Sequence, residues 1–164
     1  MARRILFVCL GNSCRSPMAQ GLMRHLLLQT DQRSEFTIAS AGTRVRNIGG
    51  PPDPRAQAAA STRDIDISDV RSRQATAADI AAHDLILAMD EASRQDLLLL
   101  APESAGDKVR LLLDFAPGYG RTDVPDPFHG GPDDYMLALD LIEGGCAGVL
   151  TSLAQSPTSS GSKP

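Results

Sequence analysis

Short apolar runs alternate with stretches of helical periodicity along this chain. Residues 5–8 (Ile-Leu-Phe-Val) are bulky and uninterrupted, a pattern typical of a strand buried on both faces of a sheet. From Pro17 onward apolar residues recur at helical spacing, which predicts a helix soon after this strand. Further strands are predicted over 36–40, 85–89 and 109–112, and further helices over 54–61, 76–82, 91–100 and 135–153. This alternation predicts an α/β fold, in which a four-stranded, parallel, twisted sheet carries helices on both faces.

Prolines and small polar residues mark where helices begin and where the domain ends. Ser16 and Asp53 each precede a proline that suits the first position of a helix, so both are predicted N-caps. A long irregular segment, 114–134, precedes the last helix. The length of 164 residues suits a single domain, which we assign to 1–154. The tail 155–164 consists mostly of Ser, Thr, Pro and Gly and is predicted to be disordered.

The segment between the first strand and the first helix has the pattern of an anion-binding loop. Ligands of parallel sheets bind beyond the carboxyl ends of strands, and this segment begins at such an end. The free amides and partial positive charge of the next helix attract anions, and successive loop amides can wrap phosphate oxygens. The predicted phosphate-binding loop consists of Cys9, Leu10, Gly11, Asn12, Ser13, Cys14, Arg15 and Ser16.

Cys9 and Arg15 give this loop its candidate chemistry. The thiolate is the nucleophilic form of cysteine, and a helix N-terminus with a nearby guanidinium favours that form. Arg15 can hold two phosphate oxygens with its planar fork. Gly11 permits a close backbone approach or a positive φ, Asn12 tolerates left-handed geometry, and Ser16 can hydrogen-bond the thiolate as it leaves. The alternative interpretation of Cys9 is a small buried hydrophobe.

A candidate proton donor lies in the irregular segment before the last helix. Asp126 stands between two prolines, which restrict the backbone and therefore the direction of its carboxyl group. Such a group can protonate a leaving oxygen and later accept a proton from water. The alternative is a plain turn residue, because Asp-Pro is a common turn dipeptide. Asp123, Asp133 and Asp134 are competing candidates for the acid.

The cysteines and the overall charge limit the compartment and the partners. Three cysteines without framework spacing suit a reducing compartment, so we expect the cytoplasm. Cys14 is interpreted as a packing residue or, alternatively, as a partner that traps oxidised Cys9 in a disulfide. A net charge of −4 argues against nucleic acid as a partner. No apolar stretch reads as long enough to span a bilayer, and the N-terminus lacks a signal-peptide pattern, so no membrane partner is expected.

Several segments together resemble one protein family. Residues 9–17 closely resemble the active-site loop of the low-molecular-weight protein tyrosine phosphatases, and the likeness extends over about residues 3–153. Further matching segments follow in the family order at 40–43, 52–56, 87–90, 124–128 and 139–143. The resemblance implies a Rossmann-like phosphatase fold with Cys9 as nucleophile, Arg15 as phosphate clamp and Asp126 as general acid. It also implies phosphorylated proteins as substrates, with no metal and no organic cofactor. Nothing in the sequence indicates an oligomeric state.

Departures from the family concern substrate choice. This loop has Ser13 where the family's tyrosine phosphatases usually carry a bulky aliphatic residue, and Arg46 lies near the position of a frequent aromatic wall. A second aromatic residue is replaced by His129, so Phe128 remains the candidate wall for a phosphotyrosine ring, or simply packs its loop. Related arginine phosphatases carry a small β-branched hydroxyl residue at the Ser13 position, which keeps phosphoarginine as a rival substrate. Arg44 and Arg46 can attract acidic segments or can be solvated surface.

Two further functions are weighed against the phosphatase. Arsenate reductases resemble this scaffold but need additional cysteines as a thiol relay. No suitable pair lies near Met89, and Cys146 falls on the apolar face of the last predicted helix. A non-catalytic phosphate-binding module would keep the loop without turnover, yet nucleophile, arginine and acid are all present. The sequence therefore predicts a phosphatase that hydrolyses phosphotyrosine in proteins.

Overall fold

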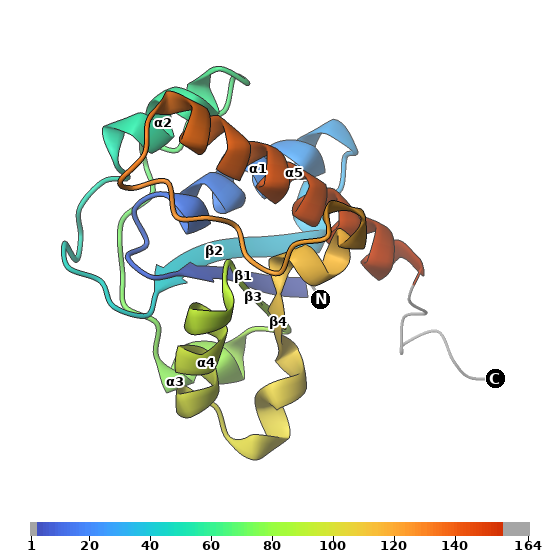
Figure 1. Ribbon diagram of the computed structural model, residues 1–164. Coiled ribbons are helices and arrows are strands. Elements are labelled where there is room, and N and C mark those ends of the chain that lie inside the picture. Colours follow the sequence, from blue (N-terminus) through green and yellow to red (C-terminus); the bar gives the residue numbers. More distant parts are fainter. Residues whose placement is uncertain (1–2, 156–164) are drawn as a thin grey trace.

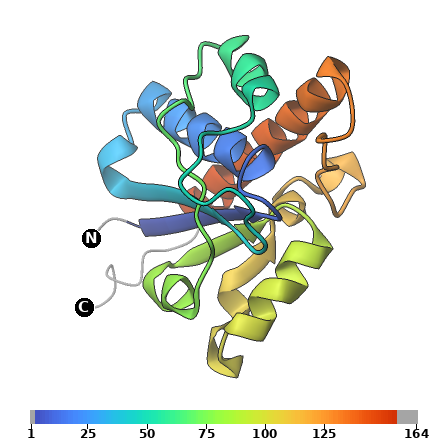
Figure 2. The same ribbon diagram turned by 90° about the vertical axis from the view of Figure 1, so that its left-hand side faces the viewer.

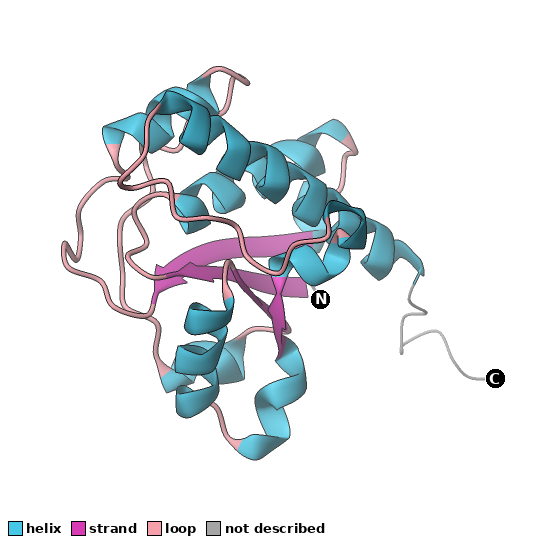
Figure 3. Ribbon diagram, in the orientation of Figure 1, coloured by secondary structure: helices cyan, strands magenta, loops and turns pink. Residues whose placement is uncertain are grey.

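The computed structural model describes residues 3–155, which form one four-stranded parallel sheet with helices on both faces. The strands lie in the order β2-β1-β3-β4. Their bounds are β1 Arg3–Cys9, β2 Phe36–Gly42, β3 Leu85–Ala88 and β4 Val109–Leu111. The first strand is central, because it pairs with β2 along its whole length and with β3 over residues 5–8. The predicted fold class is confirmed (Figures 1 and 3).

Five α-helices cover the two faces of the sheet. Figure 1 shows α1, α2 and α5 on one face, and α3 and α4 on the other. Their bounds are α1 Arg15–Gln29, α2 Pro54–Ser61, α3 Ala77–Ala82, α4 Glu91–Leu100 and α5 Pro132–Gln155, with short 3-10 helices η1 Arg33–Glu35, η2 Glu103–Lys108, η3 Leu112–Phe115 and η4 Pro117–Tyr119. Ile5 and Phe7 of β1 belong to the core under α1 and α5, whereas Leu6 and Val8 belong to the core on the opposite face. The uninterrupted apolar run of β1 follows from this burial on both faces.

The helix starts agree with the sequence at one predicted cap and differ at the other. Asp53 caps α2, and its carboxylate accepts the Arg55 backbone N–H at 2.8 Å. Ser16 is not a cap, contrary to prediction: α1 begins at Arg15 after Cys14, and Cys14 makes no side-chain cap bond. The hydroxyl of Ser16 instead takes part in a buried network under the loop, so it is not free to cap the helix.

Other boundaries shift by a few residues. Thr76 lies outside α3 and caps it in a reciprocal capping box with Asp79. The strand predicted over 109–112 ends at Leu111, because the chain turns there into a 3-10 helix. The last helix begins at Pro132 and includes Gln155. The remainder of the predicted disordered tail, like Met1 and Ala2, lies outside the described residues.

Glycines on α5 allow the chain before it to approach very closely. A Cβ atom at Gly148 would collide with the carbonyl oxygen of Phe115, and one at Gly144 would collide with the ring of Tyr119. A Cβ at Gly145 would lie 2.6 Å from the side chain of Leu112. Each glycine costs helix stability of about 1 kcal/mol relative to alanine. The close packing of α5 on η3 and η4 explains why glycine occupies these three positions.

The expectation that no apolar stretch is long enough to span a bilayer is wrong for α5. By length and composition this helix could cross a membrane, since its most apolar window has a mean hydropathy of 1.4. Helices that pack in a protein core meet the same test, and α5 packs against α1, α2 and η3 with 39% of that window buried. Its buried residues include Leu139, Ile142 and Cys146, as the apolar face predicted.

Candidate active site

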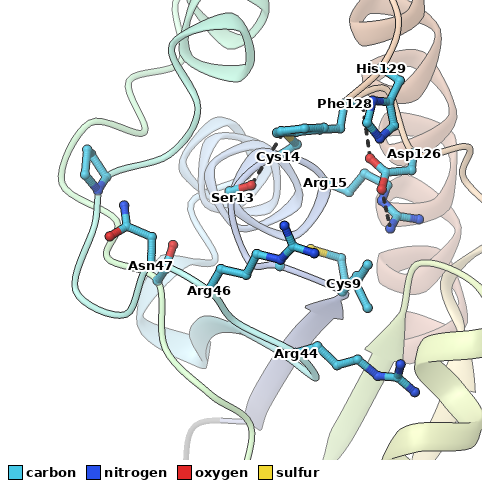
Figure 4. Close-up of a pocket in the computed structure, with 14 residues that line it drawn as sticks. Cys9, Ser13, Cys14, Arg15, Arg44, Arg46, Asn47, Asp126, Phe128 and His129 are labelled. Carbon is cyan, nitrogen blue, oxygen red and sulfur yellow. Dashed lines mark hydrogen bonds and ion pairs between the residues drawn. The ribbon is translucent and has the colours of Figure 1, made fainter.

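The segment 9–16, here called the Cys9 loop, connects the central strand to α1 and forms the floor of a cavity. Figure 2 shows several other loops gathered at the same end of the sheet, next to the carboxyl end of β1. The cavity has a volume of about 480 Å³ and is drawn in Figure 4. It is lined by Cys9, Leu10, Gly11, Ser13, Cys14, Arg15, Arg44, Arg46, Asn47, Pro51, Ser72, Asp126, Phe128 and His129. The predicted site residues therefore line one cavity, except Asn12 and Ser16, which lie buried behind it.

The Cys9 thiol lies at the end of the central strand, where two donors can stabilise its anion. The Asn12 backbone N–H donates to Sγ at 3.3 Å, and the Ser16 hydroxyl lies 3.0 Å from Sγ. Hydrogen bonds to a charged group favour the charged form. The N-terminus of α1, which begins at Arg15, adds its partial positive charge. This geometry suits a thiolate that attacks a bound anion and later leaves.

Asn12 supports the loop from behind. Its φ of 53° lies in the left-handed region, which asparagine tolerates better than most residues. Its side-chain amide donates to Ser16 at 2.8 Å and to Ser40 at 3.0 Å, and its side-chain oxygen accepts the Arg73 backbone N–H at 2.9 Å. Gly11 lines the cavity but is not among the residues with positive φ, so the left-handed turn that either residue was predicted to make belongs to Asn12.

Arg15 is held by carboxylates on two other segments. One guanidinium nitrogen donates to Asp90 at 2.7 Å and to the carbonyl of Val124 at 2.9 Å. The other lies 3.7 Å from the Asp126 carboxylate. Burial lowers the pKa of Arg15, but the negative charges of Cys9, Asp90 and Asp126 outweigh it and raise the pKa above its ordinary value. A permanently charged, oriented guanidinium is what binding of two phosphate oxygens requires.

Asp90 is the supporting residue that the sequence reasoning missed. It follows β3, caps α4 by accepting the Ser93 backbone N–H at 2.8 Å, and fixes Arg15. Burial raises the pKa of Asp90, but the hydrogen bond and charge of Arg15 and the bonds from Ser93 bring it below the ordinary value. Its position after an apolar strand, at the same sheet edge as Cys9, was the available signal.

Among the residues that the structure describes, Asp126 supplies the only carboxylate in the lining of the cavity. Segment 123–131 is here called the Asp126 loop. The Val124 backbone N–H donates to the carbonyl of Met89 at 2.8 Å and fixes the start of this loop. Within the loop, the Phe128 N–H donates to the Asp126 carboxylate at 3.1 Å. This Asx-type turn leaves the second carboxylate oxygen near Arg15.

The three competing acids lie outside the lining of the cavity. Asp123 accepts the backbone N–H of Glu91 at 3.0 Å, and Asp134 accepts that of Gly131 at 2.8 Å. Asp133 lies in the first turn of α5. The geometry therefore favours Asp126 over these three.

The rim of the cavity combines an aromatic ring with two arginines. Phe128 is 46% exposed, and its ring meets that of His129 edge to face at a centroid distance of 5.1 Å. Figure 4 shows the Arg46 guanidinium reaching over the cavity between Ser13 and Cys9. Arg44 lies on the same side and pairs with Asp96 at 3.3 Å. The cavity therefore offers apolar and cationic contacts to a group that carries the phosphate.

Cys14 and the remaining cysteine differ from Cys9 in their surroundings. The Cys14 thiol lies 3.4 Å from the Tyr135 hydroxyl, and burial raises its pKa. Burial also raises the pKa of Cys146, inside the core. These surroundings disfavour the thiolate at both positions. Among residues 3–155, no three His, Cys, Asp or Glu side chains are placed to hold a metal ion.

Comparisons with known proteins agree with this geometry. The sequence profile described as low molecular weight phosphotyrosine protein phosphatase matches residues 4–159. The human enzyme of that name is 36% identical over 135 residues, covering 81% of this chain and 84% of its own. A protein tyrosine phosphatase from Entamoeba histolytica superposes with a TM-score of 0.90 at 30% identity, over 94% of this chain and 98% of its own. A serine mutant of the YwlE arginine phosphatase, phosphorylated on that active-site serine, superposes with a TM-score of 0.83 at 28% identity, over 93% and 97%.

The family profile matches nearly the whole chain, and the sheet and helices superpose on those of solved phosphatases. Together these findings assign the chain to one family of hydrolases. The chain is a member of the low molecular weight phosphotyrosine protein phosphatase family.

Proposed function

We propose that this chain hydrolyses phosphotyrosine in proteins through a cysteinyl-phosphate intermediate. The observation that carries the proposal is the arrangement of Cys9, Arg15 and Asp126 around one cavity, with two hydrogen-bond partners on Sγ and an Arg15–Asp126 distance of 3.7 Å. In the first step the Cys9 thiolate attacks phosphorus, and the bond from phosphorus to the tyrosyl oxygen breaks. Asp126 gives its proton to that oxygen, while Arg15 and the loop amides hold the phosphoryl oxygens.

The second step returns the enzyme to its starting state. The Asp126 carboxylate takes a proton from water, whose oxygen attacks phosphorus, and the phosphorus–sulfur bond breaks. Ser16 and the Asn12 N–H stabilise the departing thiolate, and inorganic phosphate is released. The phosphorylated active-site serine in the YwlE mutant supports a covalent intermediate on the residue that replaces the active-site cysteine of that enzyme.

Phosphotyrosine is favoured as substrate by the rim. An exposed Phe128 ring offers a face to an aromatic group, and Arg46 offers a cation to a ring or to acidic residues beside it. Arginine phosphatase activity is the second candidate, because the small hydroxyl side chain of Ser13 lines the cavity and a structural neighbour is an arginine phosphatase.

Phosphorylated proteins are the proposed partners, without nucleic acid or membrane, and the cytoplasm is the proposed location.

Arsenate reduction and simple phosphate binding receive less support. The three cysteines are free and buried, and Cys146 lies in the core on α5, so it is not placed as a relay for Cys9. A non-catalytic module would not need a carboxylate next to the clamping arginine, which Asp126 supplies.

The test of the mechanism is covalent trapping on Cys9. With p-nitrophenyl phosphate, we expect a burst of p-nitrophenolate in stopped flow and a phosphate-mass adduct on Cys9 after rapid quench. Cys9→Ser should abolish turnover, whereas the control Cys146→Ser should retain it, provided that it folds. A wild-type protein that binds phosphopeptide without releasing phosphate would be a binding module.

The test of the substrate compares kcat/KM on matched peptides. We expect wild type to prefer phosphotyrosine over phosphoarginine and phosphoserine, and Ser13→Ile to reduce any phosphoarginine activity further. Arg46→Ala should weaken phosphotyrosine peptides with acidic neighbours more than those with neutral neighbours, because a cation at the rim is lost. A wild-type preference for phosphoarginine would replace the proposed substrate with the rival.

A further inference from the structure

Arg55, in the first turn of α2, contacts the Asp126 loop although it does not line the cavity. One guanidinium nitrogen donates to the carbonyl of Phe128 at 2.9 Å. The guanidinium carbon lies 5.1 Å from the centroid of the Phe128 ring and 5.1 Å from that of Tyr135. Arg55, on α2, therefore contacts both the backbone and the ring of Phe128.

Asp53 fixes the direction of this guanidinium. Its two carboxylate oxygens accept from Nε at 3.0 Å and from a terminal nitrogen at 2.9 Å, a two-point contact that holds the planar fork. The hydrogen bond from Arg55 holds the pKa of Asp53 below its ordinary value. Asp53 is itself tied to the Cys9 loop, because its backbone N–H donates to the carbonyl of Ser13 at 2.9 Å.

These contacts form a continuous connection between the two loops of the site. From the Cys9 loop it passes through Asp53 and Arg55 to Phe128, and the Phe128 N–H donates to the Asp126 carboxylate at 3.1 Å. A shift of the Phe128 backbone would therefore turn the carboxylate that faces Arg15. The side chain of Asp126 is 45% exposed, so packing does little to hold it in place.

We propose that Arg55 is a positioning residue for Asp126, an assignment that rests on the proposed function. It touches no reacting atom. It fixes the part of the Asp126 loop that aims the carboxyl group at the leaving oxygen. Loss of Arg55 should therefore affect the substrates that need a proton on the leaving group, and leave those with good leaving groups nearly unaffected.

The test measures kcat/KM over a series of aryl phosphates of rising leaving-group pKa. For Arg55→Ala we expect a loss of roughly 10- to 100-fold with the poorest leaving groups and a much smaller loss with p-nitrophenyl phosphate. Arg55→Lys should lie between wild type and Arg55→Ala, because an ammonium keeps the charge but not the fork. An equal loss over the whole series would overturn the proposal.

Arg63 provides a matched control, because it is also an arginine with carboxylate partners close to α2 and α5. It follows α2 and pairs with Asp140 and Glu143 of α5, without contact to the Asp126 loop. Arg63→Ala therefore removes an arginine bridge between α2 and α5 but should leave the leaving-group dependence unchanged. If both alanine variants steepen that dependence alike, Arg55 acts through general stability and the proposal fails.

A double-mutant comparison separates this proposal from the general-acid assignment. In the Asp126→Asn background, Arg55→Ala should change kcat/KM by less than about twofold, since residues acting through one group are not additive. A further loss as large as in wild type would show that Arg55 acts independently. If Asp126→Asn alone has no leaving-group-dependent effect, the acid assignment is what fails. Should Arg55→Ala not fold, Arg55→Gln, which keeps a donor for the Phe128 carbonyl, takes its place in the comparison.

Discussion

The Cys9 loop and the Asp126 loop face the same cavity but are held in opposite ways. In the Cys9 loop, Asn12 and Ser16 are 0% exposed and bond to each other and to their neighbours. In the Asp126 loop, the Asp126 side chain is 45% exposed and its carboxylate depends on a few contacts. A loop that binds phosphate can be supported by buried side chains, whereas a group that exchanges protons with substrate and water has to stay accessible to both. The two loops should therefore respond differently to substitution.

The sharpest contrast is expected from Asp126→Asn. Because an amide cannot donate a proton as a carboxylic acid does, kcat/KM should fall by roughly 10²- to 10⁴-fold for poor leaving groups. The exposed side chain contributes little to packing, so the melting temperature should barely move. Steady-state kinetics on the aryl phosphate series, with a thermal melt of each variant, measures both. A large loss of stability would remove the contrast between the loops.

Asn12→Gly tests the opposite loop. Glycine accepts the left-handed φ, so this variant isolates the lost side-chain hydrogen bonds from backbone strain. Two buried serine hydroxyls and the half-buried Arg73 N–H lose their bonds to the amide, and we expect a loss of roughly 2–4 kcal/mol in the free energy of unfolding. Activity should fall for all leaving groups alike. Urea denaturation and the same kinetic series check this, and an unchanged unfolding midpoint would contradict it.

Asp90→Asn tests a residue that belongs to neither loop. Asp90 acts on the site through the side chain of Arg15. The charge that orients the guanidinium is lost, so we expect kcat/KM to fall by about tenfold, mostly through a weaker hold on phosphate. Inhibition by inorganic phosphate should weaken by a similar factor. A loss of kcat with unchanged phosphate affinity would place Asp90 in another role.

The smallest effect concerns acid stability. The pKa of Asp90 is lower in the folded state than in the unfolded chain. The Arg15–Asp90 pair therefore stabilises the folded state to its full extent at pH values above the ordinary carboxyl pKa of about 4. That stabilisation is lost as the pH falls through the folded-state pKa. The melting temperatures of wild type and Asp90→Asn should therefore converge as the pH is lowered from 7 towards 2. Parallel curves would mean that the pair is not linked to folding.

The sequence was most informative where structure is local. The apolar run of β1, the Cys9 loop and α1 are contiguous, so their pattern predicts a strand, an anion site and a helix together. Asp53 was correctly identified as a cap for the same reason. Ser16 looked like an equivalent cap, but its hydroxyl is committed to Cys9 and Asn12, which local pattern does not reveal.

Residues that act over long sequence separations were not predictable in the same way. Asp90 and Arg55 reach the site through contacts with Arg15 and Phe128, far away in the chain. Asp126 shared its local pattern with an ordinary turn, and only the folded arrangement brings it to 3.7 Å from Arg15. Choice among the four candidate aspartates therefore depended on the family resemblance, and on tertiary contacts that spacing does not specify.

The central place of β1 has a consequence for how the molecule opens. A strand with hydrogen-bonded neighbours on both sides is exposed to solvent only in the rarest fluctuations, so its amides should be among the last to take up deuterium. The segment carrying Asp126 should exchange much earlier. A partly opened molecule would then keep the strand that carries Cys9 in place while its proton donor is displaced, so it would cleave substrates with poor leaving groups slowly.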